Sequence, residues 1–172
     1  MIMRPGDPLL LPANPLFIVF TLLLALAVNL LPLGRHPAVP DVLALVLVFW
    51  AVHQPRRVGI FAAFGFGLAM DVHQGALLGQ HALGYTLLSF GAIAMHRRLL
   101  WFELPSQMLH LLPLFLGVQL VTLLVRLAAG GMFPGWSMWL APGLQTLLWP
   151  VAVLLLLAPQ RRAPDPDQNR PL

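Results

Sequence analysis

The chain has 172 residues, of which 59% are hydrophobic and only 9% are charged, and its formal net charge is +4. A soluble domain carries about a quarter charged residues, so this composition excludes a water-soluble fold and predicts an all-α integral membrane protein. The absence of cysteine excludes disulfide bonds, thiolate metal sites and a cysteine nucleophile. All ten positive charges are arginines that occur singly or in pairs, which argues against a nucleic-acid interface.

Six apolar segments follow one another along the chain, and each is predicted to be a transmembrane helix. In chain order they cover residues 16–33, 42–52, 58–70, 77–95, 109–127 and 136–158. The first segment ends without an A-x-A cleavage pattern, so we expect it to remain as a helix and not to be a signal peptide. Residues 1–158 are therefore predicted to form a single six-helix domain. The Pro- and charge-rich residues 159–172 are predicted to be a disordered cytoplasmic tail.

The arginines predict the orientation of these helices. If all six helices cross the membrane, eight of the ten arginines fall on one side: Arg4, Arg56, Arg57, Arg97, Arg98, Arg161, Arg162 and Arg170. Arg35 and Arg126 fall on the other side. Because positive charge is retained in the cytoplasm, both termini are predicted to be cytoplasmic.

Two short helices are expected to leave a recess on the outer side. Residues 58–70 rise only about 20 Å, whereas the hydrocarbon core of a bilayer is about 30 Å thick. Asp41 lies 15 residues before Arg56, in the turn at residues 53–57, and Asp71 lies 15 residues after it, so an antiparallel hairpin would place both acids at similar depth. The polar residues that we expect to line the recess are His73, Gln74, Gln80 and His81.

An outer-side polar cluster is predicted from Asp41, Asp71, Arg126 and Arg35. Asp41 follows Pro40 at a helix start, where an acid complements the helix dipole, so a capping role is expected. Asp71 needs a partner at membrane depth. Arg126, at the end of a polar stripe, is the favoured partner, and Arg35 is the second candidate. Two further polar residues are expected to form interhelical hydrogen bonds: Asn29 and Gln145.

Small residues recur every four positions before Asp71. Gly59, Ala63 and Gly67 share one face of a helix with that acid. Small residues at this spacing allow another helix to approach closely in a membrane, so the three are predicted to form a helix-packing face.

Catalytic interpretations fit the sequence poorly. Intramembrane aspartyl proteases carry a Gly-x-Gly-Asp signature, whereas three residues separate Gly67 from Asp71 here. A rhomboid-like nucleophile would have to be Ser137, which lies at an interface beside Pro134. The six histidines show no metal-ligand spacing. We therefore predict no catalytic, cofactor-binding or metal-binding residues, and no enzyme.

The stretch from residue 39 to residue 85 resembles the rod shape-determining MreD family of rod-shaped bacteria. The resemblance depends on the order and spacing of several short motifs: Pro40-Asp41, Trp50, Pro55, Val58-Gly59, Gly67-Leu68 with Asp71, Gly75, Leu78-Gly79 and Tyr85. The chain length, the six apolar segments and the predicted orientation are similar too.

This resemblance implies a multi-pass, non-catalytic scaffold of the cell-wall elongation machinery in the bacterial inner membrane. The implied direct partner is the bitopic protein MreC, among membrane lipids. MreB filaments, the glycosyltransferase RodA and an elongation-type penicillin-binding protein are implied as indirect partners. The family fold is thought to be similar to the substrate-binding subunits of energy-coupling-factor vitamin transporters. A solute-binding transporter subunit is therefore the alternative function.

Overall fold

The computed structural model describes residues 13–31 and 38–160. In these residues it contains six α-helices, two short 3₁₀ helices and no strand. Arg35 and residues 161–172, which make up most of the predicted tail, lie outside the described residues. The helices are α1 (Pro15–Leu30), α2 (Val42–His53), α3 (Ile60–Gln74), α4 (Gln80–Trp101), α5 (Leu104–Ala128) and α6 (Leu140–Leu157). The 3₁₀ helices η1 (Trp136–Trp139) and η2 (Ala158–Gln160) flank α6.

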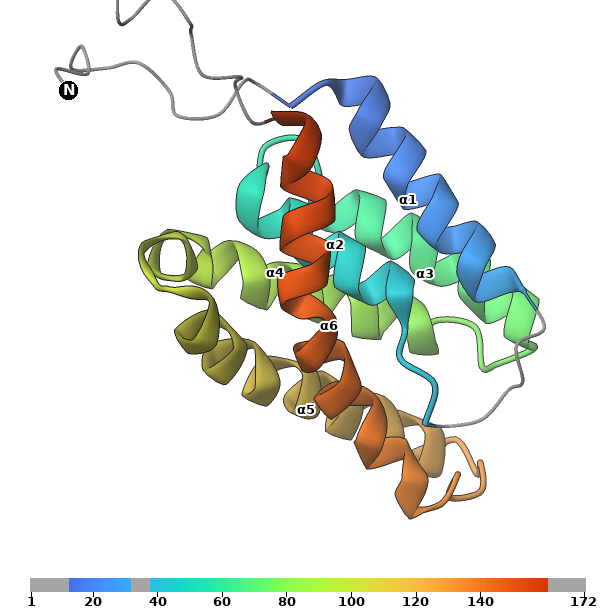
Figure 1. Ribbon diagram of the computed structural model, residues 1–172. Coiled ribbons are helices and arrows are strands. Elements are labelled where there is room, and N and C mark those ends of the chain that lie inside the picture. Colours follow the sequence, from blue (N-terminus) through green and yellow to red (C-terminus); the bar gives the residue numbers. More distant parts are fainter. Residues whose placement is uncertain (1–12, 32–37, 161–172) are drawn as a thin grey trace, which may run out of the picture.

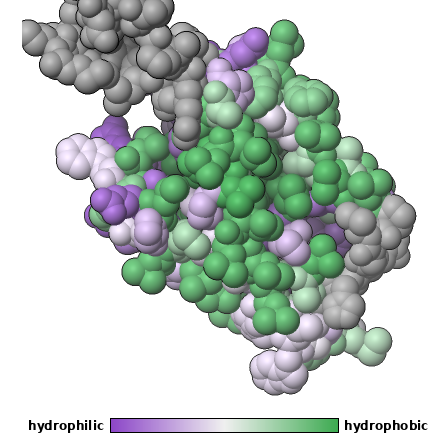
Figure 2. Space-filling model, in the orientation of Figure 1, coloured by the Kyte–Doolittle hydropathy of each residue, from purple (hydrophilic) through white to green (hydrophobic). Residues whose placement is uncertain are grey.

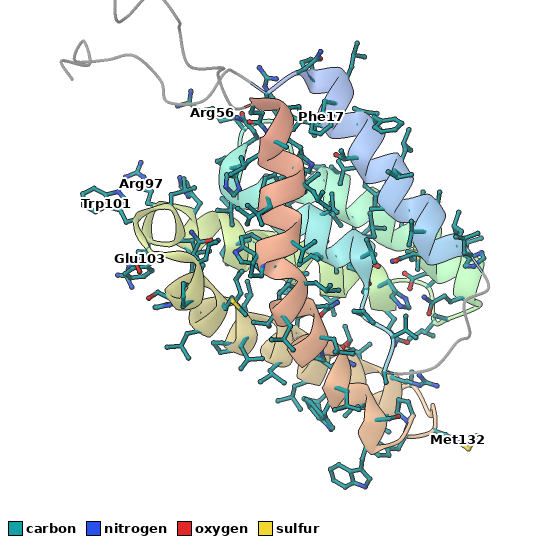
Figure 3. All side chains as sticks on the ribbon, viewed as in Figure 1. Phe17, Arg56, Arg97, Trp101, Glu103 and Met132 are labelled. Atoms are coloured by element: carbon teal, nitrogen blue, oxygen red, sulfur yellow. The ribbon has the colours of Figure 1, made fainter. Side chains whose placement is uncertain are left out.

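Successive helices run in alternating directions between two ends of a bundle (Figure 1). The start of α1 lies near the end of α6, so the described chain begins and ends on the same side. On that side, Arg57 of the α2–α3 turn donates a hydrogen bond to the carbonyl of Ala13. Figure 3 shows Arg56 and Arg97 far from Met132, which lies in the α5–α6 connection at the opposite end. We call the end of the bundle with Arg56 and Arg97 the arginine end. We call the end with Met132 the cavity end, after the cavity described below.

Helix α2 is the centre of the bundle. All residues from Leu43 to Val52 are buried, and each exposes at most 8% of its surface. A helix that is apolar on every side is stable when either protein or lipid covers it. Here α1, α4 and α6 pack around α2. The short helix is therefore enclosed by protein and not by lipid.

Two groups of four helices share the pair α2 and α4. In the first group α1 and α3 complete the ring, and in the second α5 and α6 complete it. Helices α2 and α3 are antiparallel, as expected, but they do not pack side by side, because α3 packs mainly on α4 and makes at most marginal contact with α2. The tight turn between α2 and α3 brings only their ends together, and α4 separates the rest.

Local sequence sets the ends of these helices. Asn14 caps α1 through a side-chain hydrogen bond to the amide of Leu16, and a proline follows at the first helical position. Helix α3 extends to Gln74, four residues beyond the predicted end at residue 70. It stops at Gly75, which has φ of 60° and so adopts the left-handed conformation that favours glycine. Asp71 is consequently inside α3, in its last turn.

The outer surface of the bundle is strongly apolar, as expected of a protein in lipid. The face in Figure 2 is dominated by hydrophobic residues over α6. Large exposed apolar side chains also lie on other helices, including Phe20 on α1, Phe61 on α3 and Phe90 on α4. Two segments, Leu104–Ala128 and Trp136–Gln160, are long and apolar enough to cross a membrane by themselves. These observations fit a membrane protein, and the number of crossings stays a prediction.

Candidate functional site

A cavity of about 1150 Å³ opens at the cavity end of the bundle. All six helices contribute residues to its wall, because α1, α3 and α5 end there and α2, α4 and α6 begin there. His73, Gln74, Gln80 and His81 line this cavity, as expected for the recess.

Asp41 joins four helices at the edge of this cavity. It is the N-cap of α2, and its Oδ1 accepts a hydrogen bond of 2.9 Å from the amide of Ala44. The same oxygen accepts a bond of 2.6 Å from Nδ2 of Asn29 on α1. Its Oδ2 accepts a short bond from the Tyr85 hydroxyl on α4, and its backbone carbonyl accepts one from Gln145 on α6. The predicted capping role is confirmed, and so are the interhelical bonds of Asn29 and Gln145.

Asp71 holds the first turn of the next helix along the chain. Its Oδ2 accepts hydrogen bonds from the amides of Gly79, at 2.8 Å, and Ala82, at 3.3 Å. Its Oδ1 accepts from the amide of His81 at 2.7 Å and from the His81 ring Nδ1 at 2.8 Å. The N-cap of α4 is Gly79, which has no side chain to bind the free amides of the first turn. Asp71 supplies that cap from α3.

The two acids are connected through one face of α4. His81 and Tyr85 are one helical turn apart, and their rings meet edge to face with centroids 6.1 Å apart. His81 binds Asp71, and Tyr85 binds Asp41. These four side chains connect the start of α2 and the end of α3 to the first turns of α4.

Another part of the cavity wall comes from α5. Gln119, Thr122 and Arg126 all line it, so the predicted polar stripe does face the recess. The expected pairing of Asp71 with Arg126 is wrong within the described residues: the partners of Asp71 there are three amides and His81. The reason is geometric, because the start of α4 lies directly against the end of α3. The other candidate, Arg35, lies outside the described residues.

The predicted packing face of α3 has two buried members. Ala63 has no exposed surface, and Gly67 lies against α4, where an added Cβ would be 2.6 Å from the backbone nitrogen of Ala82. Gly59 is the N-cap of α3, and nothing lies within 4 Å of the Cβ position there. The close approach at Gly67 brings Asp71, one turn later, to the amides of α4.

The structure thus brings Asp41 and Arg126 to one cavity and places Asp71 just behind its wall, through His81. Sequence reasoning missed Tyr85 as a member of the polar cluster. Its spacing of four from His81 was the available signal, because that spacing places both rings on one face of a helix. Among the described residues, no group of three or more His, Cys, Asp or Glu side chains could hold a metal ion.

The fold and the cavity define a class: a helical membrane protein in which two aspartates hold helix ends together. The family model of the rod shape-determining protein MreD matches residues 11–158. The rod shape-determining protein MreD of Haemophilus influenzae is 30% identical over 135 residues, which cover 76% of this chain and 81% of that protein. The chain belongs to the MreD family of rod shape-determining membrane proteins.

No solved structure matches the chain. The expected likeness to energy-coupling-factor subunits therefore stays a prediction, and neither matching family nor matching relative supports the alternative of a solute-binding transporter subunit.

Proposed function

We propose that this protein is a non-catalytic scaffold of the bacterial cell-wall elongation machinery, needed for rod shape and side-wall peptidoglycan synthesis. Membership of the MreD family is the observation that carries the proposal. Its direct partner is an MreC-like bitopic membrane protein. Through it the scaffold is linked to an MreB-like filament, a RodA-like glycosyltransferase and an elongation-type penicillin-binding protein.

The use of the two acids supports a structural role. Both oxygens of Asp71 and Oδ1 of Asp41 accept hydrogen bonds from amides at helix starts, and Oδ2 of Asp41 accepts one from the Tyr85 hydroxyl. A general acid or base needs an oxygen that can reach a substrate proton. These carboxylates instead fix the relative positions of four helices.

In this proposal the protein lies in the inner membrane, with six crossings and both termini in the cytoplasm. The alternating helix directions support this topology, because the described chain starts and stops at the arginine end. Arg56, Arg97 and Arg98 are exposed there, where the positive-inside rule favours the cytoplasm.

Partner contacts are expected within the membrane. Connections such as residues 75–79 and 102–103 are short and offer little interface. The helices offer much more, since α1, α5 and α6 each expose several large apolar side chains. An MreC-like transmembrane segment would pack on this surface in competition with lipid.

The test is a clean deletion of the gene in the bacterium that carries it. Cells should become round, and an MreC-like protein should be lost from the elongation complex purified in mild detergent. An untagged copy of the gene should restore both rod shape and retention. Rods of normal width after deletion, with no suppressor mutation, would contradict the proposal.

A further inference from the structure

The two walls of the cavity differ in their free hydrogen-bonding capacity. Asp41 lines one part of the wall and Asp71 lies just behind it, and both already accept bonds from helix ends and from Tyr85 and His81. On the other wall, no described residue makes a hydrogen bond with the side chain of Gln119 or Arg126. The side chains of Gln119 and Arg126 therefore have unused donors at the cavity wall, and Arg126 carries a full positive charge.

The backbone after α5 keeps the arginine side chain in this position. The amide of Gly131 bonds to the carbonyl of Arg126 at 2.9 Å, so the chain folds back over the last turn of α5. A Cβ at residue 131 would lie 2.8 Å from Cγ of Arg126. The missing side chain at Gly131 leaves room for the arginine to lie across it, at the cavity wall.

Apolar side chains make up much of the remaining wall. They come from α3, α4, α5 and η1 and include Met70, Leu88, Phe115, Val118, Leu123 and Met138. The cavity volume of about 1150 Å³ lies slightly above the roughly 300–1,000 Å³ usual for small-molecule sites, so a lipid-sized ligand has room. A ligand that matches both the donor side chains of α5 and the apolar wall has acceptor oxygens, a negative charge and a hydrocarbon portion.

We propose that the cavity binds an anionic phospholipid, with its phosphodiester at Arg126 and Gln119 and its hydrocarbon against the apolar wall. A guanidinium pairs with phosphate oxygens through charge-assisted hydrogen bonds. Asp41 faces the same cavity, which favours a monoanionic phosphodiester over a dianionic free phosphate. This inference does not depend on the proposed role in elongation, because it concerns the purified chain alone.

The experiment uses the full chain purified in a neutral detergent and titrated with phosphatidylglycerol. Binding is measured as lipid retained in native mass spectrometry and as the rise in melting temperature with lipid concentration. Phosphatidylcholine with the same acyl chains tests the charge, because it keeps the phosphodiester but has no net charge. Glycerol 3-phosphate tests the need for hydrocarbon. We expect binding of phosphatidylglycerol, and binding at least about tenfold weaker for each comparator.

Two variants locate the site. Arg126→Gln should weaken phosphatidylglycerol binding at least about tenfold, whereas Arg97→Gln, an exposed arginine at the other end, should leave it unchanged. Gly131→Ala keeps the charge but displaces the arginine, and should also weaken binding, which keeps the test informative if Arg126→Gln fails to fold. Equal losses in Arg126→Gln and Arg97→Gln, or unchanged binding in Gly131→Ala, would overturn the proposal. So would equal affinity for phosphatidylcholine or for glycerol 3-phosphate.

Discussion

Gly67 of α3 lies directly against the backbone of Ala82 of α4, with no space for a side chain between them. Any larger residue at position 67 must push the two helices apart, and overpacking of this kind typically costs about 1–3 kcal/mol. We predict that Gly67→Leu lowers the melting temperature in detergent and impairs rod-shape complementation. The neighbouring Leu68 is only half-buried, so Leu68→Ile should have little effect. Equal behaviour of the two variants would contradict the close contact.

Removal of the Asp71 carboxylate should leave the first turn of α4 without its cap. Asp71→Ala removes four accepted hydrogen bonds at once. The lost cap costs about 0.5–2 kcal/mol, and each buried donor left unpaired adds to that. Asp71→Asn keeps one acceptor oxygen and should be milder. Melting temperatures of both variants check this order, with Glu103→Gln, an exposed acid at the other end, as the neutral control.

The partner of Asp71 can be identified by a double-mutant cycle. Asp71→Asn combined with His81→Ala should be milder than the sum of the two changes, because the pair shares a direct contact of 2.8 Å. Asp71→Asn combined with Arg126→Gln should be additive within about 0.5 kcal/mol. Coupling to Arg126 without coupling to His81 would contradict the observed contacts.

Tyr85 should stabilise the bundle mainly through its hydroxyl. Its ring is buried, with 4% of its surface exposed, and the hydroxyl donates to Asp41. Tyr85→Phe keeps the ring and should cost about 0.5–2 kcal/mol, the usual range for interhelical hydrogen bonds in membranes. The same change in an Asp41→Asn background should cost less. An identical loss of stability in both backgrounds would show that the hydroxyl acts elsewhere.

Topology can be tested with two single cysteines, since the native chain has none. Arg98→Cys lies at the arginine end, and an impermeant thiol reagent should label it only after the cells are permeabilised. Met132→Cys lies at the cavity end and is 84% exposed, so it should be labelled in intact cells. The reverse pattern would place the arginine end outside.

Composition and spacing were enough to predict the six helices, and the small residues before Asp71 indicated the close-packed face. The capping role of Asp41 was predictable because Pro40 and the apolar run after it mark a helix start. These are local properties, and a single sequence contains the information that determines them.

The neighbours of each helix were not predictable in the same way. The tight turn between α2 and α3 indicated two antiparallel neighbours, but α4 lies between them and covers α2 together with α1 and α6. In that arrangement Asp71 accepts hydrogen bonds from the amides of Gly79, His81 and Ala82 and does not pair with Arg126 as expected. A free backbone amide has no signature in the side-chain pattern, so this type of partner was not apparent.

The enclosure of α2 has a consequence for biosynthesis. The ribosome completes α2 at His53, yet two of the helices that cover it, α4 and α6, end only at Trp101 and Leu157. At about 1.5 Å per residue, a helix this short cannot span the bilayer core alone. We therefore expect α2 to remain next to the insertion machinery or a membrane chaperone until translation is nearly complete. Nascent chains that stop after α3 should be unstable and rapidly degraded, whereas chains that include α6 should be stable.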